Sequence, residues 1–289
     1  MPNTIALAKN YTSLLDEVYR QASVTSDLIS DSSMVRAGAN ANEIIYPQIS
    51  VTGLGDYDRN SGYTTGAVDF KWKTATFNYD RGTKISVDVM DNEESRKLAF
   101  GMAGATLQRE KVAPEADAFT FATLAGLENI SKETGELADG EAFLLALLAA
   151  WSKMDEDEVP QEQRYLYATS TLLNSVMALD TTKSREILGK FSVKKVVPQA
   201  RFYTAIDLLD GKTPGEELGH YQKAETASDI NFMIIHKPAI IKFDKHTASN
   251  IIPAELNDSA DADISKYRKY GLVDAYANKR AGIYLHSKA

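Results

Sequence analysis

The sequence predicts a mixed α+β fold in which part of the chain is extended. Two β-rich runs flank a glycine-rich stretch between residues 44 and 79, which predicts a long hairpin. Apolar residues recur at helical spacing from 92 to 125, and shorter helix and strand patterns alternate after residue 126. No internal repeat is visible. This order of elements does not match the repeated βαβ units of a doubly wound enzyme sheet.

The composition indicates a globular protein that can fold without disulfide bonds or structural metal ions. The 289 residues are 44% hydrophobic and 25% charged, which is enough for a sizeable core. There is no cysteine, so disulfides, thiolate nucleophiles and cysteine zinc sites are excluded. The formal net charge of −8 disfavours tight binding to a phosphate backbone. Without a secretory signal or an apolar run of about 20 residues, we expect a soluble, unexported protein with no membrane span.

The N-terminal region predicts a docked arm. Residues 10–30 carry apolar positions at a loose helical period, with serine and threonine enriched towards the end. We expect an amphipathic helix there, followed by a polar connector through Ala41.

The hairpin has arms that begin at Ile44 and Val68, joined by about fifteen turn-forming residues. Each arm would reach roughly 30 Å at about 3.3 Å per residue. In the return strand Phe70 and Trp72 alternate with charged residues, whereas Phe77 and Tyr79 continue on the opposite parity. The pattern therefore predicts apolar groups on both faces. Because an isolated two-stranded ribbon is marginal in water, something other than its own core must cover it.

The helical stretch from 92 to 125 has recognisable ends. Asp91 is a candidate N-cap, and Glu94 is its partner in a capping box. Gly126 is the expected stop. The helix would be about 50 Å long at 1.5 Å per residue. Pro114 lies inside it, so we expect a kink or a break near residues 112–113.

The remainder alternates between short helices and extended segments. We expect helices at 141–154 and 170–179 and a loop at 209–226. The expected strands are 164–168, 193–206 with an interruption at Pro198, 231–242 with a break at Pro238, and 266–285.

Motifs for metal or nucleotide chemistry are incomplete. Asp56, Asp58 and Asn60 imitate the opening of a calcium loop, but the sixth position is Ser61 and the twelfth is Ala67. A polar hairpin tip is the better interpretation. The segment 211–213 resembles the end of a phosphate loop but lacks its earlier glycine.

Candidate catalytic groups are equally sparse. The four histidines are too far apart for a helical zinc pair, and no Gly-x-Ser-x-Gly elbow occurs. The acidic clusters at 155–158 and 258–263 are better explained as a solvated helix end and a loop. We predict no catalytic residue, no cofactor and no metal site.

Three stretches carry a resemblance to a known family. They are YDRGTKISVD at 79–88 running into MDNEE at 90–94, VAPEADAF at 112–119, and NFMIIHKPA at 231–239 followed by ADAD at 260–263 and NKRAGIY at 278–284. In this order they resemble the major capsid proteins of tailed bacteriophages, whose fold is shared with encapsulin nanocompartments. Ala116 replaces the usual isoleucine of the second stretch, and Phe119 replaces the tyrosine.

The resemblance implies the phage major-capsid fold, an α+β architecture with a long β-hairpin extended loop. Its parts would be an N-terminal arm (1–43), the extended loop (44–82), a peripheral domain with a spine helix (83–130), an axial domain (131–229) and C-terminal strands completing the peripheral domain (230–289).

The resemblance also implies a non-enzymatic function. The chain would be a major capsid protein that self-assembles, as hexamers and pentamers, into the icosahedral head shell around the double-stranded DNA genome of a tailed phage. It would enclose DNA without sequence-specific binding, and scaffold, portal and decoration proteins are possible partners. Its place would be the virion, assembled in the host bacterial cytoplasm. Only about forty residues precede the hairpin, so we expect a separate scaffold protein or none.

The extended loop and spine are the predicted intersubunit interface. Its residues are Tyr57, Arg59, Tyr63, Phe70, Trp72, Phe77, Tyr79, Arg81, Glu94 and Arg109. We read the aromatic group as an interface and not as a base-stacking platform. Lys71 and Lys73 are available for the covalent cross-link of some relatives, but nothing selects a partner, so none is predicted.

Two alternatives remain open. The first is an encapsulin-type nanocompartment shell, which holds an enzyme cargo instead of a genome. The second is a two-domain soluble enzyme with an unrecognised site, which would be a small particle with a concave polar pocket and not a large shell.

Overall fold

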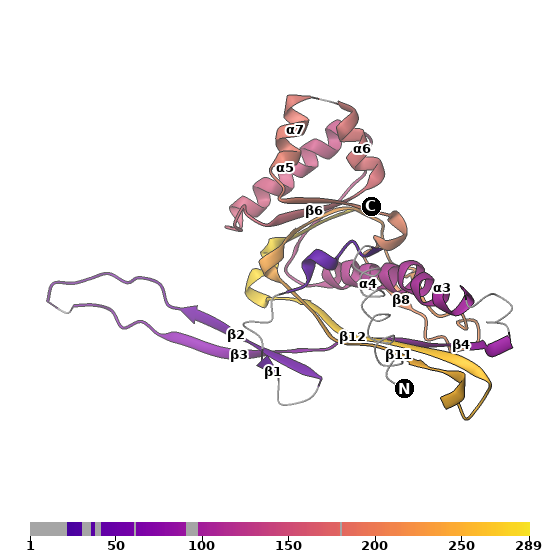
Figure 1. Cartoon of the computed structure of the whole chain (residues 1–289). Coiled ribbons are helices and arrows are strands. Elements are labelled where there is room, and N and C mark those ends of the chain that lie inside the picture. The colour runs from indigo at the N-terminus through magenta and orange to yellow at the C-terminus, as the bar shows by residue number, and fades with distance from the viewer. Residues whose placement is uncertain (1–21, 31–35, 38–41, 61, 91–97, 180) are drawn as a thin grey trace.

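The computed structural model describes residues 22–30, 36–37, 42–60, 62–90, 98–179 and 181–289. Figure 1 shows a body of stacked sheets and helices from which a two-stranded ribbon projects to one side. The predicted α+β class is confirmed. The predicted capping box at Asp91 and Glu94 and most of the predicted N-terminal helix lie outside the described residues.

A five-stranded sheet with β10 at its centre forms the middle of the body. Its order is β5 (Ser131–Thr134), β13 (Ile283–Ser287), β10 (Ile230–His236), β6 (Arg164–Thr169) and β7 (Val193–Val197). Every residue of β10 is buried, because both faces of the sheet are covered. Phe232 and Ile234 enter one core cluster, and Met233 and Ile235 enter another.

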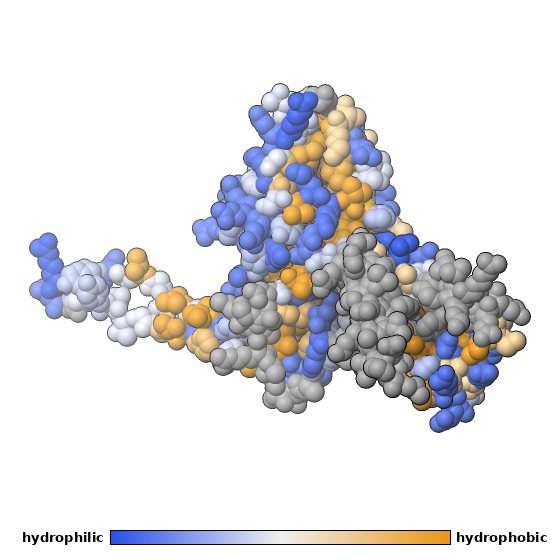
Figure 2. Space-filling view, in the orientation of Figure 1, coloured by the Kyte–Doolittle hydropathy of each residue, from blue (hydrophilic) through white to orange (hydrophobic). Residues whose placement is uncertain are grey.

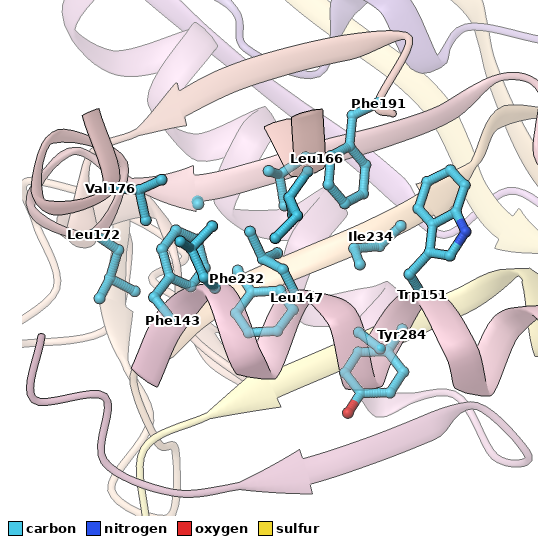
Figure 3. Close-up of a cluster of buried hydrophobic side chains, with 14 of the residues drawn as sticks. Phe143, Leu147, Trp151, Leu166, Leu172, Val176, Phe191, Phe232, Ile234 and Tyr284 are labelled. Carbon is cyan, nitrogen blue, oxygen red and sulfur yellow. The ribbon is translucent and has the colours of Figure 1, made fainter. Parts of the chain in front are cut away.

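Three helices cover one face of this sheet. They are α5 (Gly140–Glu156), α6 (Ser170–Leu179) and α7 (Thr182–Gly189). Figure 3 shows Phe143, Leu147 and Trp151 of α5 facing Phe232 and Tyr284 of the sheet. Helices α5 and α6 match the prediction. Helix α7 falls in a segment for which no element was expected.

The long helical stretch covers the other face and contains a π-helical turn. The chain runs through α3 (Leu98–Leu107), the π turn η3 (Gln108–Val112) and α4 (Ala113–Gly126). Proline has no N–H to donate to the preceding turn, and Pro114 lies directly after the widened turn. The predicted interruption at 112–113 is thus a π turn, and Gly126 is the end of α4 as predicted. No helix in the described part of the chain is long and apolar enough to span a membrane.

A second sheet packs on the opposite side of α4. Its order is β11 (Ile240–Ile252), β12 (Ala262–Ala275) and β4 (Tyr79–Asp88). Tyr267 of β12 packs on Ala113 and Ala116 of α4. Strand β11 continues ten residues beyond the predicted end at Lys242. Strand β12 ends at Ala275, so the predicted strand 266–285 is divided by the 3-10 turn η7 (Ala277–Gly282).

The predicted hairpin is present and forms the ribbon of Figure 1. Strand β2 (Glu43–Val51) pairs antiparallel with β3 (Val68–Thr76), and the short β1 (Arg36–Ala37) lies beside β2. Val51 is opposite Val68, so residues 52–67 form the tip.

The remaining elements are short. Strands β8 (Ile206–Leu208) and β9 (Tyr221–Lys223) pair within the region predicted as extended chain and loop. The 3-10 turns are η1 (Ser26–Leu28), η4 (Gln199–Arg201), η5 (Lys237–Ala239) and η6 (Ala254–Leu256). The N-terminal helix predicted to reach residue 30 does not do so, because residues 23–25 form a non-helical segment.

Candidate intersubunit surface

The base of the hairpin is held firmly by its own chain. Ile44, Tyr46 and Ala75 are buried against Ile241 and Leu272 of the β11–β12–β4 sheet. The ring of Tyr46 also packs edge-on against Tyr276, with 4.9 Å between centroids. Burial is the main reason that the pKa of Tyr46 lies above its ordinary value. The base of the ribbon is therefore packed against the β11–β12–β4 sheet of the body.

The chain leaves the hairpin at a break between β3 and β4. The side-chain amide of Asn78 donates to the carbonyl of Val273 at 2.8 Å and accepts from the N–H of Val273 at 3.0 Å. Phe77 stacks on Tyr270 with centroids 4.8 Å apart. Two residues thus separate the strand that pairs with β2 from the strand that pairs with β12. This break explains why Phe77 and Tyr79 change parity.

The distal half of the ribbon has one apolar face, and the predicted apolar character of both faces is wrong there. Pairing sets Pro47 opposite Trp72, Ile49 opposite Phe70 and Val51 opposite Val68, and alternation places these three pairs on one face. The other face carries Gln48 with Lys71 and Ser50 with Asp69. The impression of two apolar faces came from residues beyond the break.

This apolar face is open to solvent. Ile49 is 57% exposed, Val51 67%, Val68 69% and Phe70 50%. The rings of Phe70 and Trp72 meet edge to face, with centroids 5.5 Å apart. Figure 2 shows hydrophobic residues on the projecting ribbon, between its more hydrophilic tip and the body. Contiguous apolar surface of this kind marks an interaction site. The distal half therefore lacks the cover that the base receives.

The tip adds two tyrosines and a turn. The rings of Tyr57 and Tyr63 lie 4.8 Å apart and both are exposed. Asp58 accepts from the N–H of Asn60 at 2.7 Å, and Gly62 has a φ of +80° that favours glycine. Asp58 therefore stabilises a turn at the tip. No group of three or more histidine or acidic side chains suited to a metal ion occurs among the described residues.

The predicted interface residues fall into three groups. Tyr57, Arg59, Tyr63, Phe70, Trp72 and Arg109 are exposed. Phe77 is half-buried on Tyr270, and Glu94 lies outside the described residues. Tyr79 and Arg81 have internal roles.

Glu115 of α4 holds Tyr79 and Arg81 within the chain, so these two predicted residues have internal partners. Arg81 donates through Nε to Glu115 at 2.7 Å, and the Tyr79 hydroxyl donates to it at 3.1 Å. Arg81 also donates to the carbonyls of Leu209 and His220. Burial opposes ionisation of Glu115, but the His220 ring 3.5 Å away and the hydrogen bonds from Arg81 and Tyr79 hold its pKa below the ordinary value. Tyr79 is only 5% exposed within the single chain.

Asp117 anchors the N-terminal segment. This carboxylate is fully buried and accepts from the N–H groups of Val24 and Thr25 and from the hydroxyls of Ser23 and Thr25. Arg201 donates to it at 3.1 Å. These bonds explain why the chain is not helical at residues 23–25, since their backbone donors point to Asp117.

The three sequence stretches that resemble capsid proteins meet in space. Strand β4 carries the first stretch, α4 carries the second, and β10 and β13 lie in the third. Glu115 and Asp117 of the second stretch bind β4 on one side and the N-terminal segment on the other. Gly82 of the first stretch is required by close approach, because an added Cβ would lie 2.8 Å from the carbonyl oxygen of Tyr267.

Comparison with known proteins finds likeness in structure alone. No family model matches the sequence. No curated protein matches it either. The capsid of cyanophage P-SCSP1u aligns with a TM-score of 0.58 at 12% identity over 93% of this chain and 88% of that chain. The bacteriophage PhiM1 mature capsid aligns with a TM-score of 0.58 at 12% identity over 86% and 82%. The chain has the phage capsid fold.

A virus-like particle from Pyrococcus furiosus shares this capsid fold. It aligns with a TM-score of 0.55 at 9% identity over 95% of this chain and 96% of that chain. The likeness thus extends over nearly the whole length of both chains.

Sequence reasoning missed several residues of this surface. Ile49 and Val51 of β2 belong to the apolar face, and Leu54 at the tip is fully exposed. The alternation of Ile49 and Val51 with polar residues could have identified the first two. The pairing of Ile49 with Phe70 and of Val51 with Val68 could be determined only from the structure.

Proposed function

We propose that this chain is a major capsid protein that self-assembles into the icosahedral head shell enclosing the double-stranded DNA genome of a tailed phage. The observation that supports it best is the projecting ribbon, which is buried at its base and has one exposed apolar face in its distal half. The capsid fold of the neighbours agrees with this function. The proposed role is structural, and the proposed location is the virion after assembly in the host cytoplasm.

Burying the apolar face of the ribbon against another subunit would stabilise an assembly. Transferring a large apolar side chain from water into a packed interface contributes roughly 1.5–3 kcal/mol. The Ile49–Phe70 and Val51–Val68 pairs gain at most about half of this within their own subunit, since they are at least half exposed. A neighbouring copy supplies the missing cover, and the predicted five-part division of the chain is retained as part of this proposal.

A projecting element that docks on another part of an identical subunit makes a head-to-tail contact. Such contacts close into rings when the rotation between copies closes. Hexamers and pentamers are the rings that we propose. Modest individual interfaces, about 800 Å² per partner, then add around each ring. Scaffold, portal and decoration proteins are proposed as further partners.

The experiment compares the two faces of the ribbon. Ile49→Ser with Phe70→Ser removes one apolar pair, and Ser50→Thr with Asp69→Asn alters the neighbouring pair on the polar face. We expect shells from the unaltered chain and the polar-face variant, and only small species from the apolar-face variant, by sedimentation and electron microscopy. Circular dichroism checks that the fold is kept. Equal assembly by both variants would contradict the proposal.

A shell without a genome is the second candidate, because a virus-like particle shares the fold over 96% of its chain. The content of the particle separates the two. We expect particles purified from infected cells to protect double-stranded DNA from nuclease. Particles that instead hold a folded protein cargo would favour the encapsulin-type compartment.

A further inference from the structure

Residues 22–30, which we call the brace, span the two sheets of the body, and Figure 1 shows them in indigo beside α4. Asp27 pairs with Lys195 of β7 in the five-stranded sheet. Ser30 donates its backbone N–H to the carbonyl of Lys242 in β11 at 3.0 Å. The brace therefore contacts one strand of each sheet.

Thr25 is the central contact of the brace. Its hydroxyl donates to Asp117 of α4 at 2.7 Å and accepts from the ammonium of Lys242 at 2.6 Å. The ammonium also donates to the carbonyl of Thr25 at 3.1 Å. The Ser30 hydroxyl donates to the carbonyl of Ile240 and accepts from the N–H of Lys242. Thr25 thus joins α4 to the three-stranded sheet, and Ser30 adds a second attachment to the same strand.

Two short turns carry the chain between the sheets at one corner of the body. The turn η5 leads from β10 to β11, and η7 leads from β12 to β13. The N–H of Tyr276 donates to the carbonyl of Ala239 at 2.9 Å, and an added Cβ on Gly282 would lie 3.1 Å from the Cβ atom of Ala239. The two crossings therefore lie side by side, which is the geometry of a hinge.

Polar bonds hold the brace more than apolar burial does. Leu28 is the one apolar side chain of residues 22–30 that is wholly buried, and Ile29 is exposed. Polar groups exchange their hydrogen bonds for water at a small net cost, and segments with few buried apolar contacts open without global unfolding. Both sheets would keep the cover that α4 gives them, and the five-stranded sheet would keep α5, α6 and α7.

The closed brace keeps a cation out of water. Lys242 is 3% exposed, and burial lowers its pKa to about 8. Lys269 of β12 adds to the lowering, whereas Asp117 of α4 and Asp244 of β11 act in the opposite direction. Because Thr25 contacts this ammonium with two oxygen atoms, its desolvation is a cost of the closed state that opening relieves.

We propose that residues 22–30 are a releasable brace, which fixes the angle between the two sheets when it is closed and opens while both sheets stay folded. Asp117 and Lys242 hold the brace through Thr25, and the turns η5 and η7 are the hinge. This device belongs to the single chain, so it does not depend on the proposed function.

Hydrogen exchange tests whether the brace opens by itself. Mass spectrometry of the unassembled chain compares peptides from residues 22–30 with peptides from β10. We expect the brace to exchange faster than β10 in the unaltered chain. Thr25→Val keeps the shape of the side chain but removes the hydroxyl that bonds Asp117 and Lys242. Exchange of the brace should then rise about tenfold, while that of β10 is unchanged.

Three further variants complete this test. Thr25→Ser keeps the hydroxyl, and Arg268→Ala removes an exposed ion pair with Asp80 that is not part of the brace, so neither should accelerate its exchange. Ser30→Ala removes side-chain bonds to β11 and should accelerate it less than Thr25→Val. The inference falls if the brace and β10 exchange together in every variant. It also falls if neither Thr25→Val nor Ser30→Ala affects the brace.

The distance between two spin labels reports the angle between the sheets. Because the sequence has no cysteine, Lys84→Cys on β4 and Lys132→Cys on β5 place one label on each sheet at an exposed position. We expect one narrow distance distribution in this labelled chain and in the same chain with Thr25→Ser. Combining Thr25→Val, Leu28→Ser and Ser30→Ala should detach the brace and broaden the distribution.

Two results of the labelling experiment would overturn the inference. A distribution that stays narrow in the combined variant, although exchange shows that its brace is open, would mean that other contacts set the angle. Loss of protection in β10 of the combined variant would mean that the brace is an inseparable part of the fold.

Discussion

The two halves of the hairpin share one pair of strands but differ in what covers them. At the base, Tyr46 and Ala75 are 6% and 3% exposed against the β11–β12–β4 sheet. A few residues further along, Val51 and Val68 are more than 60% exposed. Both halves are rich in β-forming residues. Strand propensity therefore accounts for the pairing of the two strands, whereas tertiary contacts decide which part of the ribbon is buried within one subunit.

Three buried polar groups of the body also find their partners within the chain. Asp117, Thr25 and Lys242 are nearly inaccessible, and each is hydrogen-bonded within the chain. These three groups are therefore satisfied within the body, whereas the apolar side chains of the distal ribbon lack cover.

Removing the carboxylate of Asp117 should have the largest effect on stability. Asp117→Ala leaves four donors of residues 23–25 and the Arg201 guanidinium without their acceptor. We expect the free energy of unfolding to fall by about 3–5 kcal/mol, measured by urea denaturation. Asp27→Asn is the control, because its half-exposed pair with Lys195 should contribute less than about 1 kcal/mol. Equal losses in the two variants would show that the buried anchor adds little.

Shortening an aromatic side chain at the base should come next. Tyr46→Ala removes a buried ring and its contact with Tyr276, so we expect a loss of about 3 kcal/mol. In the unassembled chain, Ile49→Ala should cost less than about 1 kcal/mol, because Ile49 packs on little within its own subunit. Both values come from denaturation below the assembly concentration. A larger loss for Ile49→Ala would mean that the ribbon folds back on its own body.

The pH dependence of stability should report on Lys242. Burial lowers its pKa from 10.5 to about 8, so between these values the unfolded chain holds a proton that the folded chain has released. Stability therefore rises with pH across this window, by up to about 3 kcal/mol. Lys242→Met should remove the rise.

A limit to this rise is set by the buried tyrosines. Burial raises the pKa of Tyr221 to about 12 and that of Tyr167 above its ordinary value of 10. Unfolding then releases protons above pH 10, and stability should fall there in the parent and in Lys242→Met. A flat profile from pH 8 to 10 in the parent would contradict the account of Lys242.

The smallest effect belongs to the polar face of the ribbon. Lys71 pairs with Asp69 at 2.6 Å, but both side chains are more than half exposed. Lys71→Ala should change the free energy of unfolding by less than about 0.5 kcal/mol and leave assembly unchanged. Loss of assembly would show that the neighbour contacts both faces.

Local patterns predicted most elements of the fold. The apolar run from residue 231 predicted the strand that is now β10, and Gly126 and Pro114 predicted the end and the irregularity of the helical stretch. The prediction was less accurate where tertiary contacts decide the structure. Residues 23–25 turn away from the helix because of a carboxylate 92–94 residues further along the chain.

The exposed face of the ribbon could be predicted only in part. Phe70 and Trp72 alternate with charged residues in the sequence, and both are exposed. The internal partners of Tyr79 and Arg81 could not be predicted, because the break at Asn78 and the position of Glu115 depend on tertiary contacts. The assignment of all these residues to an interface stays a prediction.

The most direct measurement is electron microscopy of the purified, unaltered chain, supported by sedimentation. The account predicts closed shells of uniform size in which the ribbon of each copy lies on its neighbour. A particle of about 32 kDa that stays monomeric at high concentration, with the apolar face sheltered by its own body, would contradict it.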